Sequence, residues 1–178
     1  LKAIKSINPI ATYMIITFLK RFSWFWVLVL VQALILNNVH FFGYATPFLY
    51  IYLLLKFDAN MSRYSLLLWG FALGLAVDVF SNTPGVNAAS ATLLAFVRPF
   101  LLKLFAPRDS ADDFSPGIHS MGLAPFMRYA SVATLVHQSA LVLLVTFSFA
   151  QPSVMLLKVV SGTLLTTLCI WGVEVAKK

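Results

Sequence analysis

Long apolar runs, separated by short groups of polar and turn-forming residues, divide this chain into helical segments. Each run is close to the roughly 20 residues that a helix needs to cross a membrane. The pattern predicts six membrane-spanning helices, over residues 22–36, 41–57, 64–80, 86–105, 129–150 and 154–176. We therefore expect an all-α integral membrane protein that forms a single domain over residues 1–178.

Turn-forming residues mark the connections between these helices. Pro84 and Gly85 lie in a five-residue loop, SNTPG, after the third helix and predict a tight turn. Gly43 and Pro47 fall in the first third of the second helix, where we expect a kink. The longest loop, residues 106–126, contains proline, glycine and three aspartates, and we expect it to be a solvated segment.

The start of the chain is less regular. Residues 1–13 are mildly basic and precede Met14, a plausible translation start, so we interpret them as a possible upstream extension. Residues 10–19 are apolar enough to lie along a membrane surface. The basic pair at Lys20 and Arg21 precedes the first predicted helix. No A-x-A cleavage site follows, so this helix is a membrane anchor and not a signal peptide.

Composition supports the membrane class and gives it an orientation. The chain is 60% hydrophobic and 11% charged, whereas soluble domains are about 45–50% apolar and 25% charged. The net charge of +7 comes from lysines and arginines in loops and at helix ends. It therefore favours membrane orientation over nucleic-acid binding. Because the first, third and fifth loops contain no lysine or arginine, both termini and the loop 106–126 are predicted to be cytoplasmic.

The residues needed for common catalytic or metal sites are missing. Cys169 is the single cysteine and the three histidines are scattered, so neither a disulfide nor a zinc site is expected. Ser161-Gly162 lacks the leading glycine of a GxSG protease motif. The stretch PGVNAAS, residues 84–90, lacks the serine and arginine of a phosphatase phosphate clamp. We predict that the protein is not an enzyme and carries no cofactor.

Polar side chains within the predicted helices are the candidate functional residues, because ionisable groups are costly inside a bilayer and usually face a protein interior or a cavity. Asp78 lies near the outer end of the third helix. Lys158 in the sixth helix is at a similar depth. We expect Asp78 to bind either Lys158 or loop donors such as Asn82 and Asn87.

Arg98 and His137 are predicted to lie near the middle of the membrane, on the fourth and fifth helices. Arg98 is therefore expected to contact His137 or Gln138, through water. Two interpretations of all these polar groups stay open. They either tie the helices together or line a functional cavity or partner-binding site.

Two further patterns occur on the helices. Gly70 and Gly74 form a GxxxG pattern that lets another helix approach closely, and that helix belongs either to a partner protein or to this chain. Glu174 and Lys178 are spaced for an i,i+4 ion pair, which we expect to be solvated and without function.

The stretch GFALGLAVDVFSNTPGVNAASATLLAFVRP, residues 70–99, resembles the MreD family of rod shape-determining proteins. The similar features are a glycine-rich third helix that ends in an aspartate, a serine and turn residues, followed by a glycine and small residues. In this chain they are Gly70, Gly74, Asp78, Ser81, Gly85, Asn87 and Ala88. Residues 37–57 also resemble the second-helix region of that family, and the resemblance covers roughly residues 14–178.

The resemblance implies a non-catalytic subunit of the bacterial cell-wall elongation complex in the cytoplasmic membrane. Such a subunit binds MreC and helps to regulate lateral peptidoglycan synthesis and rod shape. It is associated indirectly with MreB, RodA and a class B penicillin-binding transpeptidase. The Gly70/Gly74 face would then suit a partner helix.

The resemblance also implies a fold similar to the substrate-binding subunits of energy-coupling-factor transporters. This raises an alternative function, a membrane subunit that binds a vitamin-type small molecule in an outward-facing cavity. Both functions place the chain among membrane lipids, and neither involves nucleic acid.

Overall fold

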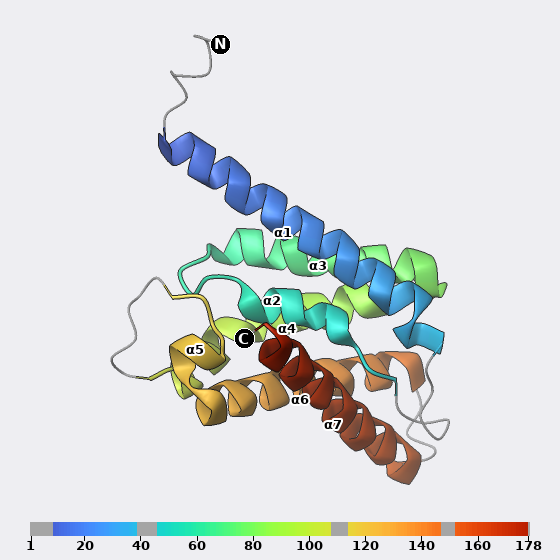
Figure 1. Cartoon of the computed structure of the whole chain (residues 1–178). Helices are drawn as coiled ribbons and strands as arrows, with labels where there is room; N and C mark the ends of the chain where they lie inside the picture. Colours follow the sequence, from blue (N-terminus) through green and yellow to red (C-terminus); the bar gives the residue numbers. More distant parts are fainter. Residues whose placement is uncertain (1–8, 39–45, 108–113, 147–151, 178) are drawn as a thin grey trace.

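The computed structural model of the chain describes residues 9–38, 46–107, 114–146 and 152–177. Helices make up nearly all of these ranges, and the described residues contain no strand. In chain order the elements are α1 (Pro9–Leu34), η2 (Leu36–Asn38), η3 (Leu49–Ile51), α2 (Tyr52–Lys56), α3 (Arg63–Ser81), α4 (Val86–Phe105), α5 (Ile118–Met121), α6 (Leu123–Thr146) and α7 (Pro152–Ala176) (Figure 1).

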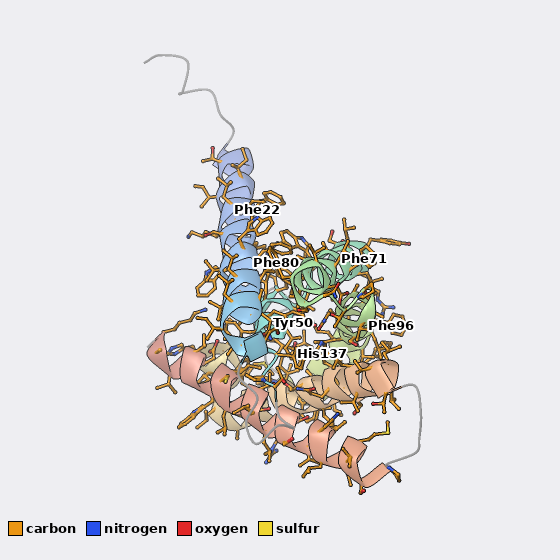
Figure 2. The ribbon with its side chains drawn as sticks, turned by 90° about the vertical axis from the view of Figure 1, so that its right-hand side faces the viewer. Phe22, Tyr50, Phe71, Phe80, Phe96 and His137 are labelled. Carbon is orange, nitrogen blue, oxygen red and sulfur yellow. The ribbon has the colours of Figure 1, made fainter. Side chains whose placement is uncertain are left out.

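Five of the described helices are long and apolar enough to cross a membrane: α1 from Ile15 onward, α3, α4, α6 and α7. The chain is therefore an all-α, multi-pass membrane protein. The helices α3 and α4 match the predicted ranges almost residue for residue. Large apolar side chains on their outer surfaces, such as Phe71 and Phe96, are about half exposed and point away from the bundle (Figure 2).

The first helix is longer than expected. It begins at Pro9, so residues 10–19 continue into the spanning helix and do not form a separate surface segment. The physical reason is that no glycine or proline interrupts residues 10–36, and apolar residues propagate a helix once it has begun. Trp69 of α3 holds α1 in place through ring contacts with Phe18 and Phe25, each with centroids 5.9 Å apart.

Part of the expected loop 106–126 is also helical. Residues 118–121 form α5, and α6 begins at Leu123, where the predicted helix begins only at residue 129. Pro125 indicated a loop in the sequence, but proline is compatible with the first turn of a helix. Phe126 is fully buried, so this end of the loop is part of the core. The loop aspartates 109, 112 and 113 lie outside the described residues.

The largest departure from the predicted helices is the second one, expected over residues 41–57. Its described part contains the three residues of η3 and the five of α2, together only about 12 Å of helix rise. A hydrocarbon core is about 30 Å thick. Pro47 lies in the extended residues 46–48 that precede η3, whereas the kink expected at Gly43 falls outside the described residues.

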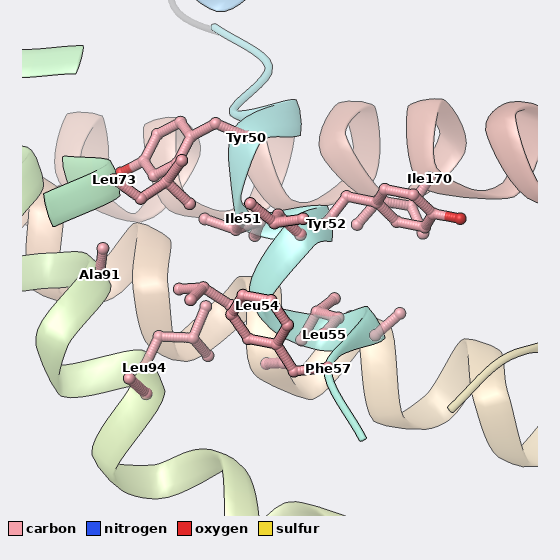
Figure 3. Close-up of a cluster of buried hydrophobic side chains, with 14 of the residues drawn as sticks. Tyr50, Ile51, Tyr52, Leu54, Leu55, Phe57, Leu73, Ala91, Leu94 and Ile170 are labelled. Atoms are coloured by element: carbon pink, nitrogen blue, oxygen red, sulfur yellow. The ribbon is translucent and has the colours of Figure 1, made fainter. Parts of the chain in front are cut away.

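We call residues 46–58 the central segment, because the long helices surround it. Tyr50, Ile51, Leu54 and Leu55 have no exposed surface. Figure 3 shows Tyr50 and Tyr52 pointing in opposite directions from the segment, with Leu73, Leu94 and Ile170 of three long helices around it. Irregular backbone at membrane depth is tolerated where protein buries it. The central segment thus forms the middle of the core.

The segment also returns the chain toward the end at which α1 begins. Pro47 lies beside Gln32, near the end of α1, and Asp58 forms an ion pair with Arg21, eleven residues earlier in that helix. The central segment is therefore antiparallel to α1 (Figure 1). We call the end with Arg21 and Asp58 the inner end, since it is predicted to face the cytoplasm, and the end with the α3–α4 turn the outer end.

The GxxxG pattern packs α3 against α4 of the same chain. A Cβ on Gly70 would lie 2.9 Å from the Cβ of Ala95, and one on Gly74 would lie 2.5 Å from the Cα of Ala88. No partner helix can use this face without separating the two helices. Of the two alternatives for the pattern, the structure therefore favours internal packing, and the expected partner-helix face is corrected.

The turn between α3 and α4 follows the predicted residues. Asn82 ends α3 in the left-handed conformation, with φ of 54°, and Gly85 precedes α4 with φ of 84°. Pro84 lies between them in the turn. Glycine adopts positive φ at little cost, so Gly85 allows the chain to reverse within a few residues and brings the start of α4 beside the end of α3.

We expect Gly74→Ala to lower the free energy of unfolding by about 1–3 kcal/mol, because the new methyl group would overlap the α4 backbone. Gly172→Ala in α7 is the matched control: nothing lies within 4 Å of a Cβ there. It should be neutral, or stabilising by up to about 1 kcal/mol through helix propensity. Thermal unfolding in detergent measures both changes, and equal effects would contradict the close packing.

Candidate functional site

Asp78 anchors the α3–α4 hairpin at the outer end. Its side chain is 3% exposed and accepts hydrogen bonds from the backbone N–H groups of Asn87 and Ala88, at 3.0 and 2.9 Å. It also accepts from the Asn87 amide at 3.0 Å and the Thr83 hydroxyl at 2.9 Å. The first N–H groups of a helix have no partner within it and favour a negative charge. Asp78 therefore caps α4 from the neighbouring helix.

The structure brings Asp78 together with one of its two expected kinds of partner. Asn87 is adjacent, as a loop donor. Lys158 is partly exposed on α7, and none of the four donors to Asp78 comes from it. Four hydrogen-bond donors already surround the Asp78 carboxylate, so it needs no cation to be stabilised here.

A chain of hydrogen bonds continues from Asn87 into the core. The Asn87 side-chain oxygen accepts from the Tyr50 hydroxyl at 3.2 Å, and that hydroxyl lies 2.7 Å from Nε2 of His137. Tyr50 and His137 have no exposed surface and lie between the helices in Figure 2. The hydroxyl has one hydrogen, which Asn87 receives, so we infer that Nε2 of His137 carries a proton and donates it to the hydroxyl oxygen. Every donor in the chain then points toward the Asp78 carboxylate.

Arg98 stabilises the opposite end of the central segment. Its side chain is 1% exposed, and its Nη2 donates to the carbonyl oxygens of Phe57 and Leu55. The Tyr129 hydroxyl donates to the same Leu55 carbonyl at 3.4 Å. Leu55 lies in the last turn of α2 and Phe57 directly follows it, where a helix leaves carbonyl acceptors unpaired. The expected contact of Arg98 with His137 or Gln138 is corrected, because α2 ends beside Arg98 and supplies acceptors of its own.

Gln138 lies instead at the start of the central segment. Its amide nitrogen is 3.4 Å from the carbonyl oxygen of Thr46 and 3.5 Å from the hydroxyl of Thr166. The same Thr166 hydroxyl accepts from the backbone N–H of Phe48 at 3.0 Å. Gln32 donates to the carbonyl oxygen of Pro47 at 2.9 Å. Side chains of α1, α6 and α7 therefore bind the backbone N–H and C=O groups of the extended residues 46–48, which have no hydrogen-bond partners within a helix.

The sequence analysis missed the roles of Gln32 and Thr166. The signal for Gln32 was present, since it is an amide within the apolar run of the first helix. Such a residue usually bonds to neighbouring helices or freed backbone in a membrane protein. Thr166 gave a weaker signal, because threonine is common in such helices and can bond to its own backbone.

Glu174 is another residue whose placement differs from the prediction. It is 6% exposed, forms an ion pair with Lys56 at 3.0 Å and accepts from the backbone N–H of Ile118 at 3.2 Å. The Tyr52 hydroxyl also donates to it. The predicted solvated pair with Lys178 is corrected, since Glu174 faces the core, and Lys178 lies outside the described residues. The partner Lys56 is remote in sequence, so local spacing did not indicate it.

Two cavities lie beside the ends of the central segment. The outer cavity has a volume of about 500 Å³, and polar side chains in its wall include Asn37, Ser81, Thr83 and Asn87. The inner cavity has a volume of about 370 Å³. Its charged wall residues are Lys20, Arg21, Lys56, Asp58 and Lys177. Metal chelation is not indicated by either, since no group of three acidic, histidine or cysteine side chains comes together in the described residues.

The ammonium group of Lys177 is electrostatically perturbed at the inner cavity. Partial burial lowers its pKa, nearby Lys56 lowers the pKa further, and Glu174 acts in the opposite direction. The ammonium lies 4.1 Å from the ring centre of Trp24 and donates to the Tyr52 hydroxyl at 3.1 Å. An additional negative charge in this cavity would therefore favour the charged form of Lys177.

Comparison with known proteins assigns no relative. No protein-family model, curated protein or solved structure matches the chain. The resemblance of residues 70–99 to MreD and the similarity to transporter subunits accordingly remain predictions. The function of the chain is therefore argued from its own geometry.

We expect Tyr50→Phe to lower the free energy of unfolding by about 1–3 kcal/mol. The change keeps the ring but leaves the buried oxygen of Asn87 and Nε2 of His137 without their partner. Tyr64→Phe is the control, because Tyr64 is 87% exposed and should change stability by less than about 0.5 kcal/mol. Unfolding in detergent tests both, and a tolerated Tyr50→Phe would contradict a cooperative polar chain.

Double-mutant cycles distinguish the two expected partners of Asp78. Asp78→Ala and Asn87→Ala should show a coupling energy of about 1 kcal/mol or more, because the two side chains are in direct contact. Asp78→Ala and Lys158→Met should be additive within about 0.5 kcal/mol. Strong coupling in the second cycle would show that the lysine does stabilise the carboxylate.

Proposed function

We propose that the protein is a non-catalytic membrane subunit of the bacterial cell-wall elongation complex, located in the cytoplasmic membrane, and that it binds MreC. The observation that supports this most directly is how the buried polar groups are used. Asp78 and Asn87 fix the hairpin, and Arg98 holds the central segment. In other membrane proteins, buried ionisable groups of this kind often bind a ligand or take part in catalysis. Here they stabilise the fold, so we propose that the protein acts through the lipid-facing surface of its helices.

The motif that resembles MreD supports the same proposal by its structural role. Gly70 and Gly74 permit close packing, Gly85 permits the turn, and Asp78 caps α4. These residues form one device, the tight α3–α4 hairpin. The residues that carry this motif's resemblance to MreD act together in this one hairpin. Such a resemblance implies a similar local structure, which scattered identical residues would not.

We place the MreC membrane helix on α7, since the Gly70/Gly74 face is already filled. The neighbouring helices bury 17% of the residues in the apolar stretch of α7, the lowest share among the five long helices, against 22% in α1, 33% in α3, 39% in α6 and 44% in α4. Besides Leu156, six large apolar residues are exposed on α7, and these six recur at three- and four-residue spacing, as helix–helix seams require. They are Leu157, Val160, Leu164, Leu168, Trp171 and Val175.

Affinity purification from native membranes in mild detergent, followed by mass spectrometry, tests the proposed complex. We expect MreC together with wall synthases. Recovery of a transporter's membrane coupling subunit with paired ATPases, and without MreC, would overturn the proposal. Because the Gly70/Gly74 face stabilises the fold, leucine substitutions there would reduce recovery through unfolding and are not a suitable test of the interface.

Photo-crosslinking tests the α7 surface separately. A photoreactive amino acid at Leu164 should crosslink to MreC, whereas one at Phe96 of α4 should not. Both side chains are about 60% exposed, so the two variants are matched in access. A probe at the fully buried Leu73 controls for unfolded protein. Crosslinks from Phe96 and not from Leu164 would move the interface to the α3–α4 side.

The outer cavity favours one alternative, a subunit that binds a small molecule for uptake. Its volume of about 500 Å³ lies in the range of ligand pockets, about 300–1,000 Å³. Aromatic Phe48 and Phe80 face it together with the polar residues named above. Under this alternative the purification described above would recover the coupling subunit and ATPases. Ala33 of α1 also lines this cavity, and Ala33→Leu would then reduce uptake of the transported compound by narrowing the cavity without removing a side-chain hydrogen bond.

A further inference from the structure

The inner cavity lies between α1 and the packed bundle. Ile16, Thr17, Trp24 and Leu28 form its α1 wall, and Tyr52, Leu53 and Lys56 of the central segment form the opposite wall. Lys177, at the end of α7, closes one side through its contact with Trp24. Figure 1 shows that α1 and the end of α7 lie on different sides of α2 here. The cavity thus has walls from three separate parts of the chain.

Positive charge exceeds negative charge around this cavity. Arg21 forms an ion pair with Asp58, and Lys56 forms one with the buried Glu174. Lys20 and Lys177 also face the cavity. Neither forms an ion pair in the described part of the chain, although Glu174 partly stabilises the charge of Lys177. Two cations are therefore left for an anion from outside the chain. Asp58 also accepts from Ser115, so its negative charge is already engaged on two sides.

The wall changes from cationic to apolar along the membrane normal. Leu28 is eight residues beyond Lys20 on α1, about 12 Å of helix rise toward the membrane centre. Leu53 lies on the same apolar side, one helical turn before Lys56. Trp24 lies between the cationic and apolar parts, which is the depth at which tryptophan is enriched in membrane proteins. A free anion would use only the cationic end of such a cavity.

We infer that the inner cavity binds the phosphate group of an anionic glycerophospholipid, with the lipid's glycerol and upper acyl chain against Trp24, Leu28 and Leu53. Lys20 and Lys177 bind the phosphate. Basic pockets between membrane helices on the cytoplasmic side suit anionic head groups. A volume of about 370 Å³ accommodates the head-group region, and the acyl chains extend along the bundle surface into the bilayer.

Native mass spectrometry of the purified full-length chain tests the inference with phosphatidylglycerol, phosphatidylcholine and inorganic phosphate as probes. We expect phosphatidylglycerol to be retained in preference to phosphatidylcholine. Lys20→Gln with Lys177→Gln should weaken its binding roughly 30-fold, about fivefold for each lysine. Lys103→Gln is the control, since Lys103 lies in the last turn of α4 and does not line the cavity. It should leave binding unchanged.

Charge-preserving variants and a position-specific signal separate binding from folding. Lys20→Arg with Lys177→Arg should bind phosphatidylglycerol like the wild type. Brominated phosphatidylglycerol should quench tryptophan fluorescence more than brominated phosphatidylcholine, and Trp24→Phe should remove that difference. Three results would overturn the inference. The first is that the Lys20→Gln, Lys177→Gln double variant binds phosphatidylglycerol as tightly as the wild type, and the second is that Lys103→Gln loses as much binding as the double variant. The third is that inorganic phosphate displaces phosphatidylglycerol completely, which would identify a free-anion site.

Discussion

The structure depends on the satisfaction of backbone polar groups in a short segment that crosses the core without being a full helix. A long helix pairs its own N–H and C=O groups, but η3 and α2 together leave unpaired groups at both ends. Water is scarce at this depth, so each unpaired group would cost several kcal/mol. The surrounding helices provide the missing partners. Gln32, Gln138 and Thr166 bind the start of the segment, and Arg98 and Tyr129 bind its end.

The same constraint explains why the buried polar residues are so dispersed along the chain. The segment has unpaired groups at both ends, and α1, α4, α6 and α7 each contribute partners. The helix α6 binds both ends, through Gln138 at the start and Tyr129 at the end. Asp78 extends the principle to the hairpin, where its carboxylate binds the first N–H groups of α4. The hydrogen bonds of Asn87, Tyr50 and His137 all point toward that carboxylate. They link the α3–α4 hairpin to the central segment. A negative charge at one end of such a chain strengthens every bond along it.

Local patterns predicted the parts of this fold that local interactions determine. The bounds of α3 and α4 follow from apolar runs ended by turn residues, and Gly85 marked the turn itself. The contact of Asp78 with Asn87 was among the expected alternatives, because the two residues flank one short loop. The membrane class follows from composition alone.

Long-range packing determines the rest of the fold. Residues 41–57 have the length and apolarity of a spanning helix, and only the fully buried environment of Tyr50 to Leu55 shows that the segment is internal. Glu174 resembled a surface residue because its partner Lys56 is remote in sequence.

The central segment also gives the two cavities a shared wall. Thr46 and Phe48 line the outer cavity, and Tyr52, Lys56 and Asp58 line the inner one. Because four helices fix the segment between these points, a molecule bound at either end contacts a surface that is already ordered and loses little entropy to organise it. The wall formed by α1 differs, since α1 joins the bundle through Trp69 and the central segment and has wide exposed faces. If a molecule binds in the inner cavity, we therefore expect α1 to move to accommodate it while the central segment stays in place.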